Sequence, residues 1–221
     1  MTQTRIKICG ITTVADARNA VDCGADAIGL VFYARSPRAV TVEQAAAIAA
    51  AVPPFVTVVA LFVDEPADSV QRILSGVAID MIQFHGSETA QFCGQFARPW
   101  IKALRVKPGV DLAAACHEYR QGRGILLDSW QDGVPGGTGT AFDWSLAAHS
   151  LSLPVVLAGG LNEHNVGAAM ARLRPAAVDV SGGVERAPGS KDARKIERFI
   201  AAVRSADSLE QAPRNGATDD Q

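Results

Sequence analysis

Three glycine-rich stretches in the second half of the chain have the composition of a phosphate-binding site. They are residues 136–139, the pair Gly159-Gly160, and Ser181-Gly182-Gly183. Glycine lets backbone N–H groups approach an anion closely, and a helix that starts nearby adds a favourable potential. A single glycine pair more often only ends a strand or a helix. The three stretches together favour phosphate, and we expect it to be bound by Gly137, Gly139, Gly159, Gly160, Ser181, Gly182 and Gly183.

Cys9 and Asp128 each end a short strand-like segment and could act as a base and an acid. Polar and apolar residues alternate up to Cys9, and Asp128 closes the apolar segment 125–127. Proton-transfer groups of barrel enzymes lie at the C-terminal ends of parallel strands. The alternatives are a buried structural thiol for Cys9 and a turn cap for Asp128.

Other polar residues lie at or near the predicted strand ends. Arg35 and Arg38 flank a Ser-Pro pair, and either could hold a carboxylate through two hydrogen bonds or lie solvated on the surface. His85 is favoured as a hydrogen-bonded packing residue, and we expect no metal, because the other strand ends offer no further metal-binding set. Lys7 shares a strand face with Cys9, so its ammonium could lower the pKa of the thiol.

Alternating strand and helix patterns must position these residues. The last helix is expected from about Lys191 to Arg204, and a fourth helix from Ser87 to about Phe96. Eight strand–helix units in about 200 residues predict an α/β protein with a single-domain (β/α)8 TIM barrel, and the alternative is an open doubly wound sheet. The expected strands are residues 5–9, 27–32, 55–63, 78–84, 100–106, 124–128, 154–158 and 176–180.

Composition limits the class of protein. The chain has 221 residues, of which 48% are hydrophobic and 20% charged, as expected for one globular domain. We expect a barrel over residues 1–204 and a disordered tail over 205–221, because the tail is polar and acidic. The body is nearly neutral, so we expect no nucleic acid partner. No apolar run or N-terminal signal pattern indicates a membrane, so we expect a cytoplasmic protein, as a monomer.

The motifs together resemble the phosphoribosylanthranilate isomerase family of tryptophan biosynthesis. The resemblance runs from Arg5 to about Arg204, in order and with fitting spacing, and departs only where Gly182 replaces a usual serine and Phe84 a usual leucine. The motifs are Lys7-Ile8-Cys9-Gly10-Ile11-Thr12, Phe32-Tyr33 with Ser36-Pro37-Arg38, Gln83-Phe84-His85-Gly86, Leu126-Leu127-Asp128, Gly136-Gly137-Thr138-Gly139 with Phe142-Asp143-Trp144, Ala158-Gly159-Gly160-Leu161, Val178-Asp179-Val180-Ser181 and Gly183-Val184-Glu185.

The resemblance implies an Amadori rearrangement of a phosphosugar, the small-molecule substrate, without a metal or an organic cofactor. By analogy, Asp128 would be the general acid that opens the ribose ring, and Cys9 the general base that removes the C2′ proton. Arg38 would bind the anthranilate carboxylate, and the glycine loops the phosphate. Lys7, His85 and Asp179 would bind or position the substrate.

Two other classes remain open from the residues alone. Another ribose-phosphate barrel, such as indoleglycerol-phosphate synthase or ribulose-phosphate epimerase, would need an N-terminal extension or a metal-binding set, and we find neither pattern. A non-catalytic phosphosugar-binding barrel could keep the glycines and lose Cys9 or Asp128. Both residues are present, which favours catalysis.

Overall fold

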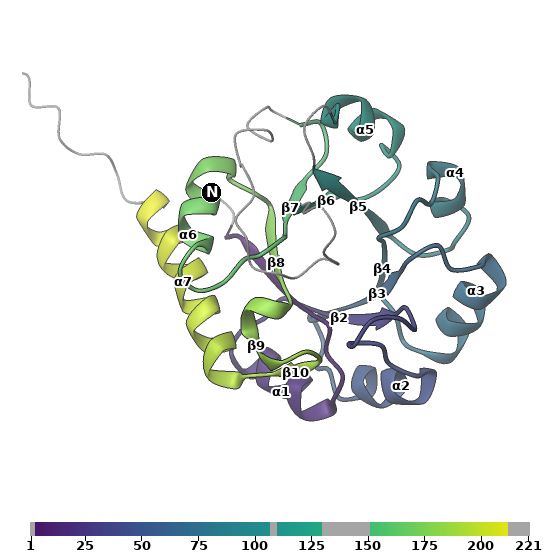
Figure 1. Ribbon diagram of the computed structural model, residues 1–221, viewed down its shortest axis with the longest axis horizontal. Helices are drawn as coiled ribbons and strands as arrows, with labels where there is room; N and C mark the ends of the chain where they lie inside the picture. Colours follow the sequence, from purple (N-terminus) through teal and green to yellow (C-terminus); the bar gives the residue numbers. More distant parts are fainter. Residues whose placement is uncertain (1–2, 107–109, 130–150, 212–221) are drawn as a thin grey trace, which may run out of the picture.

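The computed structural model describes residues 3–106, 110–129 and 151–211. Eight parallel strands, hydrogen-bonded in chain order from β1 to β8, form a closed barrel. Helices surround the strands on the outside (Figure 1). The expected single-domain (β/α)8 barrel is therefore confirmed, and the open sheet is excluded because β8 pairs with β1.

The element bounds follow the sequence expectation closely for the strands. The barrel strands are β1 (Arg5–Cys9), β2 (Ala27–Phe32), β3 (Thr57–Phe62), β4 (Met81–Phe84), β5 (Trp100–Val106), β6 (Ile125–Ser129), β7 (Val155–Leu157) and β8 (Ala177–Val180). The helices are α1 (Val14–Asp22), α2 (Val42–Ala50), α3 (Ala67–Gly76), α4 (Ala90–Cys93), α5 (Leu112–Glu118), α6 (Val166–Leu173) and α7 (Ala193–Gln211). A short 3-10 helix, η2 (Gly182–Val184), and a hairpin of β9 (Glu185–Ala187) and β10 (Ser190–Lys191) separate β8 from α7.

Alternation along β1 divides its side chains between two environments. Ile6 and Ile8 are fully buried in the main hydrophobic cluster, which also contains residues of α1, α2 and α7. Lys7 and Cys9, at the intervening positions, point to the opposite face, which is the barrel interior. Burial of Ile6 and Ile8 on one face of the strand thus fixes the orientation of Lys7 and Cys9 on the other face.

The C-terminal boundary of the barrel differs from the sequence expectation. Helix α7 continues to Gln211, so residues 205–211 are helical and the predicted tail boundary at Arg204 is wrong. Asp207 is buried, and its carboxylate accepts hydrogen bonds from the backbone N and the Oγ1 of Thr4, at 3.1 and 2.6 Å. This contact ties the end of α7 to the start of β1. The rest of the predicted tail, residues 212–221, lies outside the described residues.

Several other expectations cannot be compared with the structure. Gly137, Gly139 and the rest of the glycine stretch after β6 fall within residues 130–150, outside the described part of the chain. Within the described residues, no helix is long and apolar enough to span a membrane.

Candidate active site

Cys9 lies in a cluster of buried charges where the barrel closes. The β1–β8 register pairs Lys7 with Asp179, and the Lys7 Nζ and Asp179 Oδ1 atoms lie 2.8 Å apart. Lys7, Cys9 and Asp179 are all less than 9% exposed. Burial, the largest effect, lowers the pKa of Lys7, but Asp179 and Cys9 outweigh it and raise the pKa above its ordinary value. Lys7 is therefore a charged ammonium beside the thiol.

The expected lowering of the Cys9 pKa is wrong for the substrate-free protein. Burial, the largest effect, raises the pKa of the thiol above its ordinary value of 9.0, and Asp179 raises it further. Lys7 and Lys191 lower it, but not enough to reverse the effect of burial. The sequence analysis correctly predicted that the Lys7 ammonium lies beside the thiol. It did not show that the Asp179 carboxylate would partly cancel the charge of that ammonium.

Gly29 on β2 provides the space for this cluster. A Cβ at this position would lie 2.8 Å from Cys9 Sγ and 3.1 Å from Lys7 Nζ. Any larger residue would therefore displace the thiol or the ammonium. A glycine inside an otherwise apolar strand is a known sign of close approach, and this signal could have placed Gly29 in the candidate site.

A second chain of polar side chains links β4 to β6. His85 Nε2 lies 3.1 Å from Asp128 Oδ2, and His85 Nδ1 lies 2.9 Å from Gln83 Nε2. The side chains of His85 and Asp128 are 18% and 14% exposed, so both reach the barrel mouth without being free in solvent. The structure thus places the predicted acid in contact with the predicted histidine, and adds Gln83, to which the sequence analysis gave no role.

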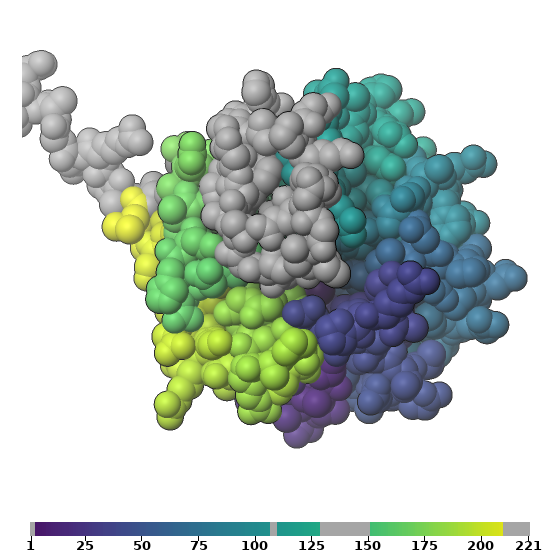
Figure 2. Space-filling view, viewed as in Figure 1, coloured from purple at the N-terminus to yellow at the C-terminus, as the bar shows by residue number. Residues whose placement is uncertain are grey.

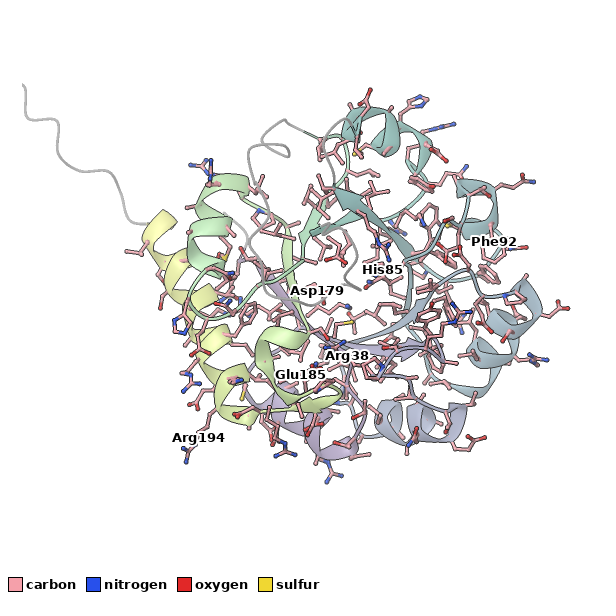
Figure 3. All side chains as sticks on the ribbon, viewed as in Figure 1. Arg38, His85, Phe92, Asp179, Glu185 and Arg194 are labelled. Atoms are coloured by element: carbon pink, nitrogen blue, oxygen red, sulfur yellow. The ribbon has the colours of Figure 1, made fainter. Side chains whose placement is uncertain are left out.

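Arg38 belongs to a third cluster, near the β9–β10 hairpin. Its Nε and Nη2 donate to Glu185 Oε1 and Oε2, both at 2.7 Å, and Figure 3 shows the two side chains together beside the barrel. Lys191, expected at a helix start, instead lies in β10 with its Nζ 2.8 Å from Glu185 Oε1. The contact with Glu185 raises the pKa of Arg38. Arg35 is exposed, so the structure distinguishes the two candidate arginines.

The Arg38 guanidinium retains a free edge in this arrangement. Guanidinium carries five N–H donors, and Glu185 takes one from Nε and one from Nη2. Among the described residues, no group accepts from the second N–H of Nη2 or from those of Nη1, so these donors can bind an incoming carboxylate. Burial alone would raise the pKa of Glu185, but hydrogen bonds from Arg38 and Lys191 outweigh burial and lower it. Glu185 is therefore an anion that orients Arg38.

The glycine loops after β7 and β8 pack against each other. A Cβ on Gly183 would overlap the carbonyl oxygen of Leu161, so only glycine allows this contact. Gly159 and Gly160 have φ of 83° and 65°, a backbone conformation that favours glycine. No hydrogen bond to another described residue engages the N–H groups of Gly159, Gly160 or Gly183. These donors are available to a bound anion.

A buried ion pair outside the barrel interior fixes the loop that carries His85. Lys102 Nζ donates to Glu88 Oε2 at 2.7 Å and to the carbonyl oxygen of Gly86 at 2.6 Å. The Glu88 carboxylate also accepts from the backbone N of Gly86 and of Asp64, each at 2.9 Å. Lys102 therefore supports the position of His85 rather than pointing into the barrel.

These clusters define a (β/α)8 barrel enzyme for a phosphorylated small molecule. A thiol, a carboxyl group, an arginine with donors unpaired among the described residues and two glycine loops with unpaired N–H groups come from the strand ends or the loops that follow them. No group of three or more potential metal ligands occurs among the described residues.

Comparison with known proteins identifies the family. The family model for N-(5'-phosphoribosyl)anthranilate isomerase matches residues 6–202. The chain is 60% identical to the N-(5'-phosphoribosyl)anthranilate isomerase of Pseudomonas putida over 206 residues, covering 93% of this chain and 100% of the relative. The corresponding protein of Pseudomonas syringae pv. tomato is 58% identical over 203 residues, with coverages of 92% and 98%.

Solved structures agree with this assignment. The phosphoribosyl anthranilate isomerase of Thermotoga maritima has a TM-score of 0.84 and 40% identity, covering 92% of this chain and 100% of its own. Another structure of a phosphoribosyl anthranilate isomerase, in complex with reduced 1-(o-carboxyphenylamino)-1-deoxyribulose 5-phosphate, has a TM-score of 0.81, 39% identity and the same coverages. The chain belongs to the phosphoribosylanthranilate isomerase family, and the isomerase activity expected from the sequence is confirmed.

The raised pKa of Cys9 can be measured directly. We expect an ultraviolet titration of thiolate absorbance, taken as the difference between the protein and its Cys9→Ala variant, to show Cys9 ionising only above pH 9.0. Lys7→Met should move the transition to still higher pH, because it removes a cation that stabilises the thiolate. A Cys9 transition below pH 8 would contradict the dominance of burial.

Proposed function

We propose that Asp128 and Cys9 perform the two proton transfers that convert N-(5'-phosphoribosyl)anthranilate into 1-(2-carboxyphenylamino)-1-deoxyribulose 5-phosphate. The observation that supports this division most strongly is the placement of the two residues. Cys9 and Asp128 lie at the ends of β1 and β6, Cys9 beside the Lys7 ammonium and Asp128 beside His85. The ammonium stabilises the thiolate that a base needs, although it does not offset burial in the free protein.

Asp128 acts first, as the general acid. Its proton passes to the ring oxygen of the ribose, the bond from C1′ to that oxygen breaks, and its electron pair stays on the oxygen. The nitrogen lone pair forms a C=N bond, which gives a cationic open-chain Schiff base. Asp128 becomes a carboxylate, and no oxidant or reductant is required.

Cys9 acts second, as the general base. Its thiolate removes the C2′ proton, the C–H electrons form a C1′–C2′ double bond, and the iminium cation is neutralised to an enolamine. The enolamine then tautomerises to the ketone. Because burial raises the pKa of Cys9 in the free protein, the cationic Schiff base is needed to favour the thiolate. Ring opening therefore precedes activation of the thiol.

Charged groups around the mouth bind the two anionic ends of the substrate. The free edge of Arg38 suits the planar anthranilate carboxylate through two parallel hydrogen bonds. The N–H groups of Gly159, Gly160 and the Ser181–Gly183 loop suit the phosphate. Gly137 and Gly139 remain predicted phosphate ligands outside the described residues. Lys7 and Asp179 bind and position the sugar beside Cys9, with His85 beside Asp128.

We propose that the protein is a cytoplasmic monomer. Phe55 and Leu209 are the exposed large hydrophobic residues in the described part of the chain, which supports a monomer. The Thermotoga maritima relative is a dimer from which monomers have been generated. Light scattering at working concentration decides between these states, and a mass of twice 23.2 kDa would contradict our proposal.

The assignment of base and acid is tested by loss of substrate fluorescence with freshly prepared N-(5'-phosphoribosyl)anthranilate. We expect Cys9→Ala and Asp128→Asn each to lower kcat by at least about 10²–10⁴-fold, with much smaller changes in KM. Cys9→Ser should be nearly as impaired as Cys9→Ala, because a hydroxyl is a far weaker acid than a thiol. A Cys9→Ser variant with nearly normal kcat would exclude Cys9 as the base.

The two arginines of the β2–α2 loop provide a matched pair of variants. Arg38→Ala should raise KM by about 10-fold or more, because the carboxylate loses charge-assisted hydrogen bonds. Arg35→Ala should leave KM nearly unchanged, because Arg35 is exposed. Thermal melts control for the buried Glu185, which loses a partner in the first variant. Equal effects on KM would show that Arg38 does not have the proposed role.

A further inference from the structure

Gln83 is a buried polar residue that the mechanism described above does not use. It is 0% exposed and lies on the same face of β4 as His85, two residues later. Its amide nitrogen lies 2.9 Å from His85 Nδ1, and the opposite ring nitrogen lies 3.1 Å from Asp128 Oδ2. In Figure 3, His85 lies on the inner side of the strands, toward the centre of the barrel. Gln83 therefore contacts the acid only through the imidazole ring.

The orientation of the Gln83 amide determines which nitrogen of His85 carries a proton. With the amide nitrogen toward the ring, its N–H donates to Nδ1, so the proton of a neutral imidazole must lie on Nε2. His85 then donates to Asp128 Oδ2. With the amide reversed, the oxygen would accept from an Nδ1–H. Nε2 could then face Asp128 only as a lone pair or as part of an imidazolium.

The unpaired atom of Gln83 favours the first orientation. Gln83 Oε1 is buried and has no hydrogen-bond partner among the described residues. Reversing the amide would put an NH₂ group with two donors in the same unpartnered place. Buried carbonyl oxygens without a full set of partners occur more often than buried N–H groups without one. The smaller cost is to leave the oxygen unpaired and to direct the N–H toward His85.

We propose that Gln83 is a positioning residue that keeps His85 neutral, with its proton on Nε2. This inference rests on Asp128 being the acid, as proposed above. His85 Nε2–H then donates to Oδ2, and the acid proton of Asp128 occupies Oδ1, facing the substrate. After Oδ1 gives up this proton, the hydrogen bond to Oδ2 persists, so His85 orients the carboxyl group in both states without exchanging a proton.

A neutral His85 matters because an imidazolium would oppose the chemistry. A cation in contact with Asp128 would favour its carboxylate form and remove the acid proton before the substrate arrives. The Gln83 N–H opposes an imidazolium, because a proton on Nδ1 would meet another donor.

The other charged groups near His85 and Asp128 do not determine where the His85 proton lies, as the Gln83 amide does. Arg105 on β5 is exposed and is in register with Asp128. Asp64 and Glu88 lie in the loops after β3 and β4, and Glu88 is paired with Lys102. The remaining titratable interior groups of the described strands are Lys7, Cys9 and Asp179, which belong to β1 and β8. None of these groups has a hydrogen bond to His85 in the described structure.

The direct test is ¹H–¹⁵N correlation of the histidine ring nitrogens in the wild-type protein. The His85 signals are identified by their loss in His85→Asn, which leaves three other histidines. We expect a neutral ring with the proton on Nε2 at pH 7. A proton on Nδ1 at pH 7, in either the neutral ring or the imidazolium, would overturn the proposal.

Variants of Gln83 test the consequence for catalysis. In Gln83→Met, the His85 proton should no longer be confined to Nε2, and kcat should fall about tenfold at pH 7 with KM unchanged. Gln83→Glu, nearly isosteric, should be the worse variant, because its carboxylate accepts from Nδ1–H and stabilises the imidazolium. Met81→Leu, on the same face of β4, is the control and should keep the wild-type kcat and ring-nitrogen signals.

The outcomes separate this inference from the proposed function. If Gln83→Met lowers kcat while the His85 proton stays on Nε2, Gln83 only packs and the proposal is wrong. The ring-nitrogen measurement needs no substrate, so it stands even if the acid assignment fails. If Asp128→Asn retains activity while His85 is neutral as expected, the acid assignment fails and the tautomer assignment holds.

Discussion

The pairing of β1 with β8 is the constraint on which the site depends. It closes the barrel and brings Lys7 opposite Asp179, so that two charges from residues 172 positions apart neutralise each other in the interior. Removing one partner of such a buried pair leaves an uncompensated charge, which typically costs about 3–5 kcal/mol. Barrel closure and the environment of Cys9 are thus a single structural feature.

The same pair limits how reactive the thiol can be in the free protein. A lone ammonium beside Cys9 would lower the thiol pKa, but Asp179 cancels part of its charge and burial dominates. Around the thiol and Arg38, three cations, Lys7, Arg38 and Lys191, face two anions, Asp179 and Glu185. The excess of one positive charge suits a substrate with a carboxylate and a phosphate. The positive charge therefore favours an anionic substrate, whereas the raised pKa of Cys9 disfavours the thiolate in the free protein.

Long-range contacts join the first and last segments of the chain. Figure 2 shows the C-terminal segments, in yellow-green, beside the N-terminal segments in purple. Helices α1 and α7 pack together, and Asp207 anchors the end of α7 to Thr4. The β9–β10 hairpin, held between β8 and α7, delivers Glu185 to Arg38. The hairpin contact lies at the site, whereas the Asp207–Thr4 contact lies at the start of β1, at the opposite end of the strand from Cys9.

The sequence predicted those features that depend on local pattern. Strand alternation placed Cys9, Asp128 and His85 at strand ends, and glycine spacing indicated the loops after β7 and β8. It could not predict that the Lys191 side chain is buried at the base of a hairpin, because its partner Glu185 and the Ser181 carbonyl are recognisable only in the folded chain. Helix α4 begins at Ala90, after the expected Ser87 cap, because the Thr89 side chain is the cap and accepts from the N–H of Phe92. The role of Gln83 likewise requires β4 and β6 together.

The central claim is that Asp128 and Cys9 act at separate, ordered steps. Its most direct test supplies an open-chain substrate analogue, which needs no ring opening, to the folded Asp128→Asn and Cys9→Ala variants. Our account predicts that the analogue partly restores turnover by Asp128→Asn, because the step that needs the acid is bypassed. It predicts no restoration for Cys9→Ala, because the missing base acts after opening. Equal rescue of both variants, or rescue of Cys9→Ala alone, would contradict it.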